Sequence, residues 1–382
     1  MYNFHTEIPT QFVLPRRINR LGQLAYNLWW TWGPEASRLF LRIDPILWEK
    51  TYHNPIRFLN QVDQPRLKNL THDRYFLDHY DRVMRLFDDY MRPSETWFSR
   101  AHGAQRGKVV AYFSSEFGLH ETMPIYAGGL GVLSGDHVKG ASDVGLPMVS
   151  VGFLYTQGYF TQHISEDGWQ EARHQRLKFE EMPVLPLLNA EGKPLTISVE
   201  LPGRNVLARL WEVRVGRVPL YLLDSDVDGN SPWDRELTSK LYISDLELRI
   251  SQEIILGIGG VRALRLLGYS PDIWHMNEGH SAFMALERAR ELVAAGSTFT
   301  EAAEQVRHSS VFTTHTPVPA GSDEFPHWLI DKYFSNLWPQ LGLDREQFVD
   351  LARNRQPWGG ETFSMPILAL RHAEHRNGVS EL

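Results

Sequence analysis

The chain has 382 residues, of which 42% are hydrophobic and 22% are charged, and its net charge is −7. This composition is typical of a globular protein with roughly two or three domains. Nucleic acid is not an expected partner, because nucleic-acid-binding surfaces are basic. The sequence contains no cysteine, which excludes disulfides, thiolate metal sites and cysteine nucleophiles. The absence of cysteine is in keeping with a reducing compartment, and we expect a cytoplasmic protein.

No stretch of the sequence suits a membrane. The first residues, MYNFHTEIPTQFVLPRR, lack the basic and then apolar segments of a signal peptide. No apolar run reaches the length of a transmembrane helix, so no membrane partner is expected.

Helical periodicity dominates the first hundred residues. Apolar side chains recur every three or four positions in residues 16–33, which predicts one amphipathic helix that ends at Gly33 and Pro34. Further helices are expected at residues 35–43, 45–49, 54–62 and 72–91. We therefore predict a mostly helical N-terminal region, residues 1–105. The cluster Trp29-Trp30-x-Trp32 could form a sugar platform, but packing between helices is the interpretation we favour.

The pattern changes near Lys108, where apolar runs of strand length begin to alternate with helical segments. The clearest helix, residues 246–267, contains three glycines, which close packing on a sheet would explain. Residues 156–190 form a long polar excursion, and residues 224–234 form an acidic loop. Strands are expected at residues 109–113, 148–155, 206–215, 218–223, 272–276 and 310–314. Repeated strand–loop–helix units predict an α/β fold with a parallel, doubly wound sheet in residues 106–382.

Residues 108–137 contain an arrangement typical of phosphate binding. The expected strand 109–113 leads into a polar segment, and the turn Gly128-Gly129-Leu130-Gly131 stands directly before a helix. The first N–H groups of a helix lack partners within it and carry the positive end of its dipole. Glycine lets an anion approach that backbone closely. A Gly-Gly-x-Gly motif alone is weak evidence, but its position between strand and helix strengthens it.

Polar residues follow three of the expected strands. They are Ser115-Glu116, Asn277-Glu278-x-His280 and His315-Thr316. Ligands of open α/β sheets bind beyond the carboxyl ends of the strands, so these residues should converge on one site with the glycine turn.

Each of these residues also has a structural explanation. Glu116 could cap a turn, His280 could bind a backbone group, and His315 could hold its own loop together. Asn277, Glu278 and His280 superficially offer metal ligands, but no His-x₃-His or carboxylate cluster accompanies them, and no metal is expected. The sequence also lacks a G-x-S-x-G elbow and a G-x-x-x-x-G-K-[ST] phosphate loop.

Several motifs together resemble the α-glucan (glycogen, starch or maltodextrin) phosphorylases. The similarity is greatest to the prokaryotic branch with an N-terminal helical extension, and it runs in order along essentially the entire chain. The motifs are SSEFGL, YAGGLGVLSGDH, GWQEARHQ, LYISDLELRISQEIILGIGGVRAL, HMNEGHSAF, THTPVPAGSDEF and NGVSEL. The resemblance implies the Rossmann-like N-terminal half of a two-domain, GT-B type glycosyltransferase. Such enzymes cleave terminal α-1,4-glucosyl units with phosphate and release glucose 1-phosphate. They use pyridoxal phosphate, whose phosphate group relays a proton to the substrate phosphate.

The resemblance also implies roles for individual residues. Gly129 would offer a backbone N–H to the phosphate region, and would thereby contact the cofactor. Leu130 would lie beside the glucosyl unit, and His315 would contact the sugar through its carbonyl group. The acidic loop 224–234 would correspond to a mobile gate. The other substrate-binding residues implied are Gly128, Glu116, Asn277, Glu278 and His280.

The family pattern continues beyond NGVSEL into a second domain. That domain carries the Schiff-base lysine and the basic residues that hold both phosphates. We therefore expect the catalytic residues in a C-terminal domain missing from this chain, and we expect the isolated chain to be inactive. Its partners would be α-1,4-glucan, phosphate and that domain. Assembly into a homo-oligomer is a further alternative.

Two other functions are compatible with these motifs. A sugar-nucleotide glucan synthase also has a Gly-Gly-Leu-Gly turn, but close to the N-terminus and with a nearby lysine, whereas 127 residues precede the turn here. A non-catalytic glucan-binding module is the second alternative. Sugar binding without turnover would favour that module.

Overall fold

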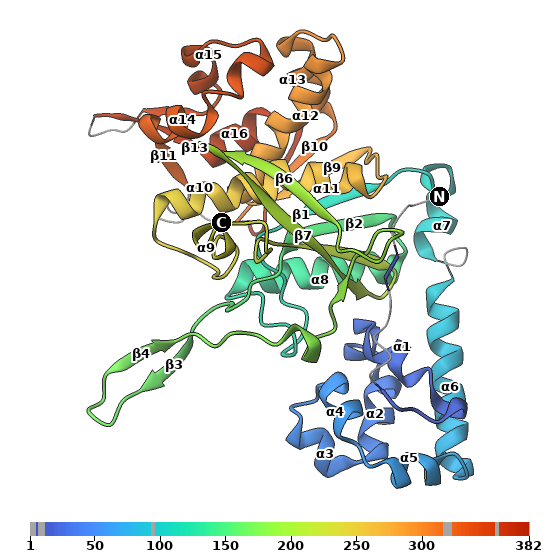
Figure 1. The fold of residues 1–382 in the computed structure, drawn as a ribbon. Helices are drawn as coiled ribbons and strands as arrows, with labels where there is room; N and C mark the ends of the chain where they lie inside the picture. The colour runs from blue at the N-terminus through green and yellow to red at the C-terminus, as the bar shows by residue number, and fades with distance from the viewer. Residues whose placement is uncertain (1–4, 7–11, 93–95, 316–322, 356–358, 382) are drawn as a thin grey trace.

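A helical N-terminal region packs beside a largely parallel sheet in this mixed α/β protein (Figure 1). The computed structural model describes residues 5–6, 12–92, 96–315, 323–355 and 359–381. The apolar side chains form two clusters, one within the helical region and a larger one around the sheet. No helix in the described ranges combines the length and the apolar character needed to cross a membrane.

The helices of the N-terminal region are short because proline and capping residues punctuate the sequence. Proline occupies an early position in four of them, where its missing N–H costs no hydrogen bond. Asp44, Asn54, Asp63 and Asp73 each cap a helix through a side-chain oxygen. The predicted helices after residue 34 are confirmed, and α5 and α7 were not predicted. The helices are α1 (Leu21–Ala25), α2 (Pro34–Ile43), α3 (Pro45–Lys50), α4 (Pro55–Gln61), α5 (Gln64–Leu70), α6 (Arg74–Met91) and α7 (Trp97–Ala101).

The prediction of one helix over residues 16–33 is wrong. The segment instead contains two 3₁₀ turns (Arg16–Ile18 and Leu28–Thr31) that flank α1. The break lies at Asn27, whose backbone is extended and whose side-chain oxygen accepts from the N–H of Trp29 at 3.0 Å. The same side chain exchanges two hydrogen bonds of 3.0 Å with the backbone of Gly216, in the distant sheet. A tertiary contact therefore overrides the local helical pattern.

The tryptophan cluster is part of the helical core. Trp29 and Trp30 are buried, and Trp30 packs edge-on against Phe40 and Trp48 at ring distances of 6.1 and 5.8 Å. The packing interpretation is confirmed for these two residues, since neither exposes a face on which a sugar could stack.

The sheet contains six parallel strands in the order β14-β10-β9-β1-β2-β8. All six predicted strands are present; β14, β5 and β6 were not predicted. Beyond β8 the sheet continues antiparallel through β7, which pairs with both β5 and β6. The strands are β1 (Val110–Phe113), β2 (Met148–Phe153), β5 (Leu185–Pro186), β6 (Thr196–Leu201), β7 (Arg204–Val215), β8 (Val218–Asp224), β9 (Ile273–Asn277), β10 (Ser310–Thr314) and β14 (His375–Gly378).

Helices cover both faces of the sheet around β1. Tyr112 contacts His137 of α8 (Gly129–Val144), with ring centres 4.7 Å apart. Its neighbour Phe113 points to the other face, where it meets Gly260 of α11 (Gly260–Leu266). α12 (Phe283–Ala294) and α13 (Phe299–His308) follow β9 and return the chain to β10.

The predicted helix 246–267 is present but contains a π-helical turn at Ile255–Gly259, between α10 (Leu246–Ile254) and α11. Its glycines allow close packing, as predicted. A Cβ on Gly257 would lie 2.7 Å from the N atom of Met284, and one on Gly260 would lie 2.5 Å from the Phe113 ring.

Two excursions depart from the central sheet. In the first, the hairpin of β3 (Thr161–Ile164) and β4 (Gln170–Arg173) projects away from the body (Figure 1). The second excursion is the segment after β10. It contains a small antiparallel sheet of β11 (Glu324–Pro326), β13 (Glu361–Ser364) and β12 (Arg353–Arg355). The acidic loop is not entirely irregular, because α9 (Pro232–Arg235) lies at its end, capped by Ser231. The remaining helices are α14 (His327–Phe334), α15 (Arg345–Asp350) and α16 (Met365–Arg371).

Candidate active site

The sheet reverses its chain order at β1, the strand before the glycine turn. The chain runs from β1 to β2 on one side and later places β9, then β10, on the other. Ligands of open α/β sheets bind at such a point, beyond the carboxyl ends of the strands. Glu116 follows β1, Asn277 ends β9, and His315 follows β10, so the predicted residues lie at the ends of three adjacent strands.

Asn277 ties these strands to the helix that begins at the glycine turn. Its side-chain oxygen lies 2.6 Å from Nε2 of His315, and its Nδ2 donates to Ser134 Oγ of α8 at 2.8 Å and to Ser114 Oγ at 3.2 Å. Asn277 is fully buried. The amide therefore holds β9, β10, β1 and α8 together, and it uses both of its polar atoms to do so.

Glu278 is held in a conformation that is normally reserved for glycine. Its backbone has φ 69° and ψ 175°, and its side chain accepts from the N–H of His315 at 2.7 Å and from that of Gly279 at 3.2 Å. Strained residues of this kind cluster at functional sites, where the surrounding structure enforces them. The sequence predicted the position of Glu278 but not its strain.

We expect Glu278→Gly to be more stable than Glu278→Ala, because both lose the carboxylate but only glycine relaxes the strained backbone. The difference should be roughly 1–3 kcal/mol in the free energy of unfolding. Urea denaturation of the two variants measures it directly. Equal stabilities would show that the backbone relaxes readily and that Glu278 stores no strain.

The Glu116 side chain holds the glycine turn in place through hydrogen bonds. Its Oε2 accepts from the N–H of Ala127 at 2.6 Å and of Gly128 at 3.4 Å, while Oε1 accepts from the hydroxyl of Tyr242. Tyr242 has φ 58°, which is unusual outside glycine. Partial burial of the Tyr242 hydroxyl, reinforced by the Glu116 carboxylate, raises the pKa of Tyr242 above its ordinary value although 43% of the residue is exposed, so the hydroxyl remains a donor. The suggestion that Glu116 caps a turn is thus correct, and the turn is the glycine turn itself.

His280 lies in a buried polar cluster behind the strand ends. Its Nδ1 is 3.0 Å from Ser115 Oγ, and its Nε2 is 3.4 Å from Oδ2 of Asp323. Burial, together with Arg249, lowers the pKa of His280 to about 4, so the ring is neutral near pH 7. The bonding partner is a serine side chain rather than the backbone group considered from the sequence.

Arg249 and Asp323 complete this cluster, and sequence reasoning missed both. Nε and Nη2 of Arg249 donate to the two carboxylate oxygens of Asp323 at 3.1 and 2.8 Å. Although burial opposes ionisation, Arg249 lowers the pKa of Asp323 to about 2. Nothing local marked these residues, since they are 74 positions apart in the chain.

The glycine turn presents unused N–H groups to the outside. α8 begins at Gly129, its first turn contains no acidic residue, and Gly128 occupies the cap position. Within the described part of the chain, the N–H groups of Gly129, Leu130 and Gly131 have no hydrogen-bond acceptor. A Cβ on Gly128 or Gly129 would have no described atom within 4 Å. The predicted position of the glycine turn at a helix N-terminus is confirmed, and its free N–H groups are the feature on which the predicted anion site depends.

Gly131 has a different function from the two glycines before it. A Cβ on Gly131 would lie 2.5 Å from Cβ of Tyr126 and 2.7 Å from Oε2 of Glu116. It is therefore needed for close packing, whereas Gly128 and Gly129 are exposed. Leu130, between Gly129 and Gly131, is half-buried. Thr316, which was predicted with His315, lies outside the described residues.

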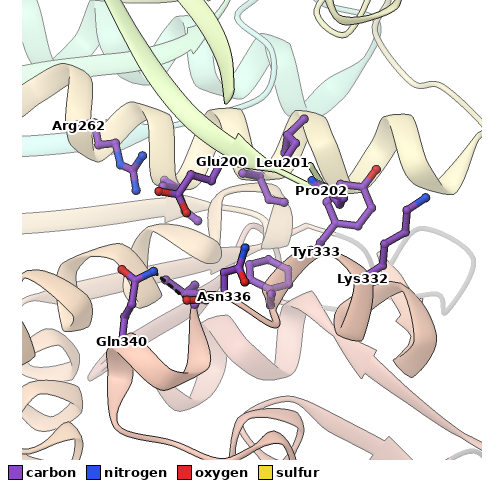
Figure 2. Close-up of a pocket in the computed structure, with 12 residues that line it drawn as sticks. Glu200, Leu201, Pro202, Arg262, Lys332, Tyr333, Asn336 and Gln340 are labelled. Carbon is purple, nitrogen blue, oxygen red and sulfur yellow. Dashed lines mark hydrogen bonds between the residues drawn. The ribbon is translucent and has the colours of Figure 1, made fainter. Parts of the chain in front are cut away.

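Neither a metal site nor the cavity beside α14 adds residues to the candidate site. In the described ranges, no group of three or more His, Cys, Asp or Glu side chains is arranged to hold a metal ion. A cavity of about 40 Å³ lies between β6, the π-helical turn and α14. Figure 2 shows the residues that line it. Its cations are already paired, Arg262 with Glu287 at 2.8 Å and Lys332 with Glu247 at 2.7 Å. The space suits a few water molecules and contains none of the predicted site residues.

The chain is similar to known proteins over almost its whole length. Residues 14–123 match a family model described as a protein of unknown function (DUF3417). The chain is 44% identical over 369 residues to the maltodextrin phosphorylase of Thermococcus litoralis, covering 97% of this chain and 43% of that protein. It is 43% identical over 392 residues to the glycogen phosphorylase of Mycobacterium tuberculosis, covering 97% and 44%. The match to the glycogen phosphorylase of Aquifex aeolicus has 40% identity over 361 residues and covers 94% and 51%.

The chain thus spans about half the length of the curated relatives that it matches. The resemblance carried by the motifs is confirmed: over almost its whole length, this chain is related in sequence to the maltodextrin and glycogen phosphorylases.

Proposed function

We propose that this chain contributes one wall of the active site of an α-1,4-glucan phosphorylase. In that reaction the C1–O4 bond of the terminal glucosyl unit breaks, a bond from C1 to a phosphate oxygen forms, and O4 receives a proton. The products are glucose 1-phosphate and a glucan shortened by one unit. The open N-terminus of α8 at Gly128 and Gly129, directed toward the strand ends, is the observation that carries the proposal.

The fold supports a GT-B type of organisation. A parallel sheet covered by helices on both faces, with its order reversed at β1, is what a Rossmann-like half requires. We propose that residues 1–105 and 106–382 form two units, in keeping with the two apolar clusters. A second Rossmann-like domain would form the opposite wall of the cleft. A cytoplasmic location and assembly into homo-oligomers are part of the same proposal.

Pyridoxal phosphate is the cofactor that this function implies. Its phosphate group needs N–H donors and free space, and the first turn of α8 offers both at Gly129. When bound, the cofactor supplies a phosphate group able to relay a proton to the substrate phosphate. The lysine that attaches the cofactor would come from the second domain, as the family resemblance implies.

The remaining site residues would bind and orient the substrate. Backbone N–H groups of the α8 first turn would hold phosphate oxygens, Leu130 would pack beside the glucosyl ring, and the carbonyl group of His315 would accept from a sugar hydroxyl. Glu116 and Glu278 keep the glycine turn and the His315 backbone in place through the hydrogen bonds described above. Rigid positioning of this kind is the main contribution that a protein makes to transfer between bound phosphate and sugar.

We expect the 382-residue chain alone not to release glucose 1-phosphate from maltodextrin and phosphate with pyridoxal phosphate present. One wall leaves the reacting groups exposed to water, and electrostatic stabilisation requires a closed site. Adding the separately expressed C-terminal half of a relative should restore activity. Turnover by the chain alone would contradict the proposal. Glucosyl transfer from a sugar nucleotide would favour the synthase, and glucan binding without turnover in the reconstituted pair would favour the binding module.

A further inference from the structure

Glu253 of α10 is a buried carboxyl group to which the proposed function gives no role. Only 2% of the residue is exposed. Nε of Arg249, one turn earlier in the same helix, lies 3.2 Å from its Oε1. Among the residues that the structure describes, however, no N–H or O–H group donates a well-directed hydrogen bond to either oxygen. A buried carboxylate without such donors is costly, so the charge state of Glu253 requires an explanation.

A second carboxylate competes for the same guanidinium. Arg249 donates Nε and Nη2 to Asp323, at 3.1 and 2.8 Å, which occupies the forked side of the arginine. His280 supplies no positive charge near pH 7, because its ring is neutral there. One guanidinium cannot balance two carboxylates away from water, so one of the two acids must hold a proton.

The proton belongs on Glu253. Burial, reinforced by the nearby Asp323 carboxylate, raises the pKa of Glu253 well above its ordinary value. The other titratable groups around the cluster add no charge, since burial also raises the pKa of Tyr155 and Tyr242. A protonated carboxyl group donates one hydrogen bond, and the acceptor that faces Glu253 is Asp323. The charges of Arg249 and Asp323 then cancel.

This cluster reaches Glu116 by two routes. On one side, Nδ1 of His280 lies 3.0 Å from the hydroxyl group of Ser115, the residue before Glu116. On the other side, the Arg249 guanidinium lies over the Tyr242 ring, 5.6 Å from its centre. The hydroxyl group of Tyr242 in turn donates to Glu116, which holds the glycine turn. A change in the cluster would therefore be felt at the turn.

We infer that Glu253 is a positioning residue that acts as a neutral carboxylic acid. Its proton joins Asp323 to α10, and the cluster fixed in this way keeps Glu116 and the glycine turn in place. The relevance of that turn to phosphate and glucan rests on the proposed function.

Glu253→Gln tests the proton, because glutamine has the same shape and can donate an N–H to Asp323 but cannot ionise. The pKa of Glu253 is raised in the folded state, so unfolding of the wild type releases a proton above about pH 5. The unfolding equilibrium constant of the wild type, divided by that of Glu253→Gln, should therefore rise with pH, by up to tenfold per unit. Urea denaturation of the 382-residue chain between pH 5 and 9 measures this ratio. A constant ratio would overturn the inference.

Glu287→Gln is the matched control. Glu287 is also fully buried, but it pairs with Arg262 at 2.8 Å and with Arg290 at 2.6 Å. Although burial opposes ionisation, these arginines lower its pKa. The stability that Glu287 contributes is therefore complete above about pH 5 and is lost only as the pH falls. Its ratio to the wild type should stay constant from pH 5 to 9. The same slope in both variants would show that the slope does not arise from Glu253.

Hydrogen–deuterium exchange tests the positioning role without phosphate or glucan. The N–H of Ala127 donates to Glu116 at 2.6 Å. As the pH rises from 5 to 9, its exchange should become about tenfold faster in the wild type than in Glu253→Gln, because ionised Glu253 loosens the cluster. Exchange in α6, which belongs to the separate apolar cluster, should be the same in both proteins.

Glu253→Met removes the donor as well as the charge. Exchange at Ala127 should then be faster than in Glu253→Gln at every pH, with no added dependence on pH. If the methionine and glutamine variants exchange equally, the donated hydrogen bond is not needed and the inference is overturned.

The outcomes are independent of the proposed function. Equal exchange at Ala127 in the wild type and Glu253→Gln at all pH values would overturn the positioning role, even if the reconstituted pair releases glucose 1-phosphate. A pH-dependent difference that glutamine abolishes and methionine does not correct would support the role, even if no glucose 1-phosphate is released.

Discussion

Replacing Gly129 with valine should abolish phosphate binding at the glycine turn and lower phosphorolysis by at least about 100-fold, with the fold intact. The added side chain would project into open space, since no described atom lies within 4 Å of its Cβ. It would, however, cover the unused N–H groups at the start of α8. Loss of one well-placed donor to a developing charge typically costs a factor of 10² to 10³ in rate. Calorimetric titration with phosphate tests the isolated chain, and glucose 1-phosphate release tests the reconstituted pair.

Gly140→Val is the matched control for this experiment. Gly140 lies in the same helix, and a Cβ there also has no described atom within 4 Å. Gly140 is far from the N-terminus of α8, where the free N–H groups lie, so its substitution should preserve phosphate binding and activity. If Gly129→Val and Gly140→Val bind phosphate equally well, the turn is not an anion site.

Gly135→Ala should lower the free energy of unfolding by about 3 kcal/mol, the largest stability effect that we expect. A Cβ at this position would overlap the carbonyl oxygen of Gly118 and lie 2.6 Å from its carbonyl carbon. Backbone atoms cannot move aside as a side chain can. Guanidinium or urea denaturation measures the effect.

The same control position serves the stability experiment. Gly140→Ala should stabilise the protein by roughly 0.5–1 kcal/mol, since alanine is the better helix former and its Cβ meets no neighbour. Equal effects of the two alanine substitutions would show that α8 does not press against the Gly118 segment. A lower free energy of unfolding for Gly135→Ala together with a higher one for Gly140→Ala would confirm that α8 lies directly against the Gly118 segment.

This close approach also fixes the geometry of the candidate site. The N–H of Gly118 donates to the carbonyl group of Gly131 at 2.7 Å, so the segment after β1 runs directly against the first turns of α8. Glu116 stands two residues before this contact and binds the glycine turn. Packing at Gly131 and Gly135 therefore sets how the free N–H groups of the turn face the strand ends.

The sequence alone determined where five of the six parallel strands lie along the chain, and it indicated that three strand ends converge. Both depend on local patterns, namely hydrophobic periodicity and the polar residues that follow each apolar run. Because parallel strands place their carboxyl ends at one edge, Glu116, Asn277 and His315 could be predicted to lie together. The motifs likewise carried the relationship to the phosphorylases.

The tertiary structure alone decided which residues hold these parts in place. Asn27 ends a helix because it binds Gly216, 189 positions away, and Tyr242 reaches Glu116 from 126 positions away. Gly128 and Gly129 leave space for a ligand, whereas Gly131 and Gly135 are needed for packing, because only the latter two lie against atoms of other segments. Such contacts join side chains that are distant in the chain, whereas the periodicity of a sequence reports only on neighbours, and so they could not be predicted from it.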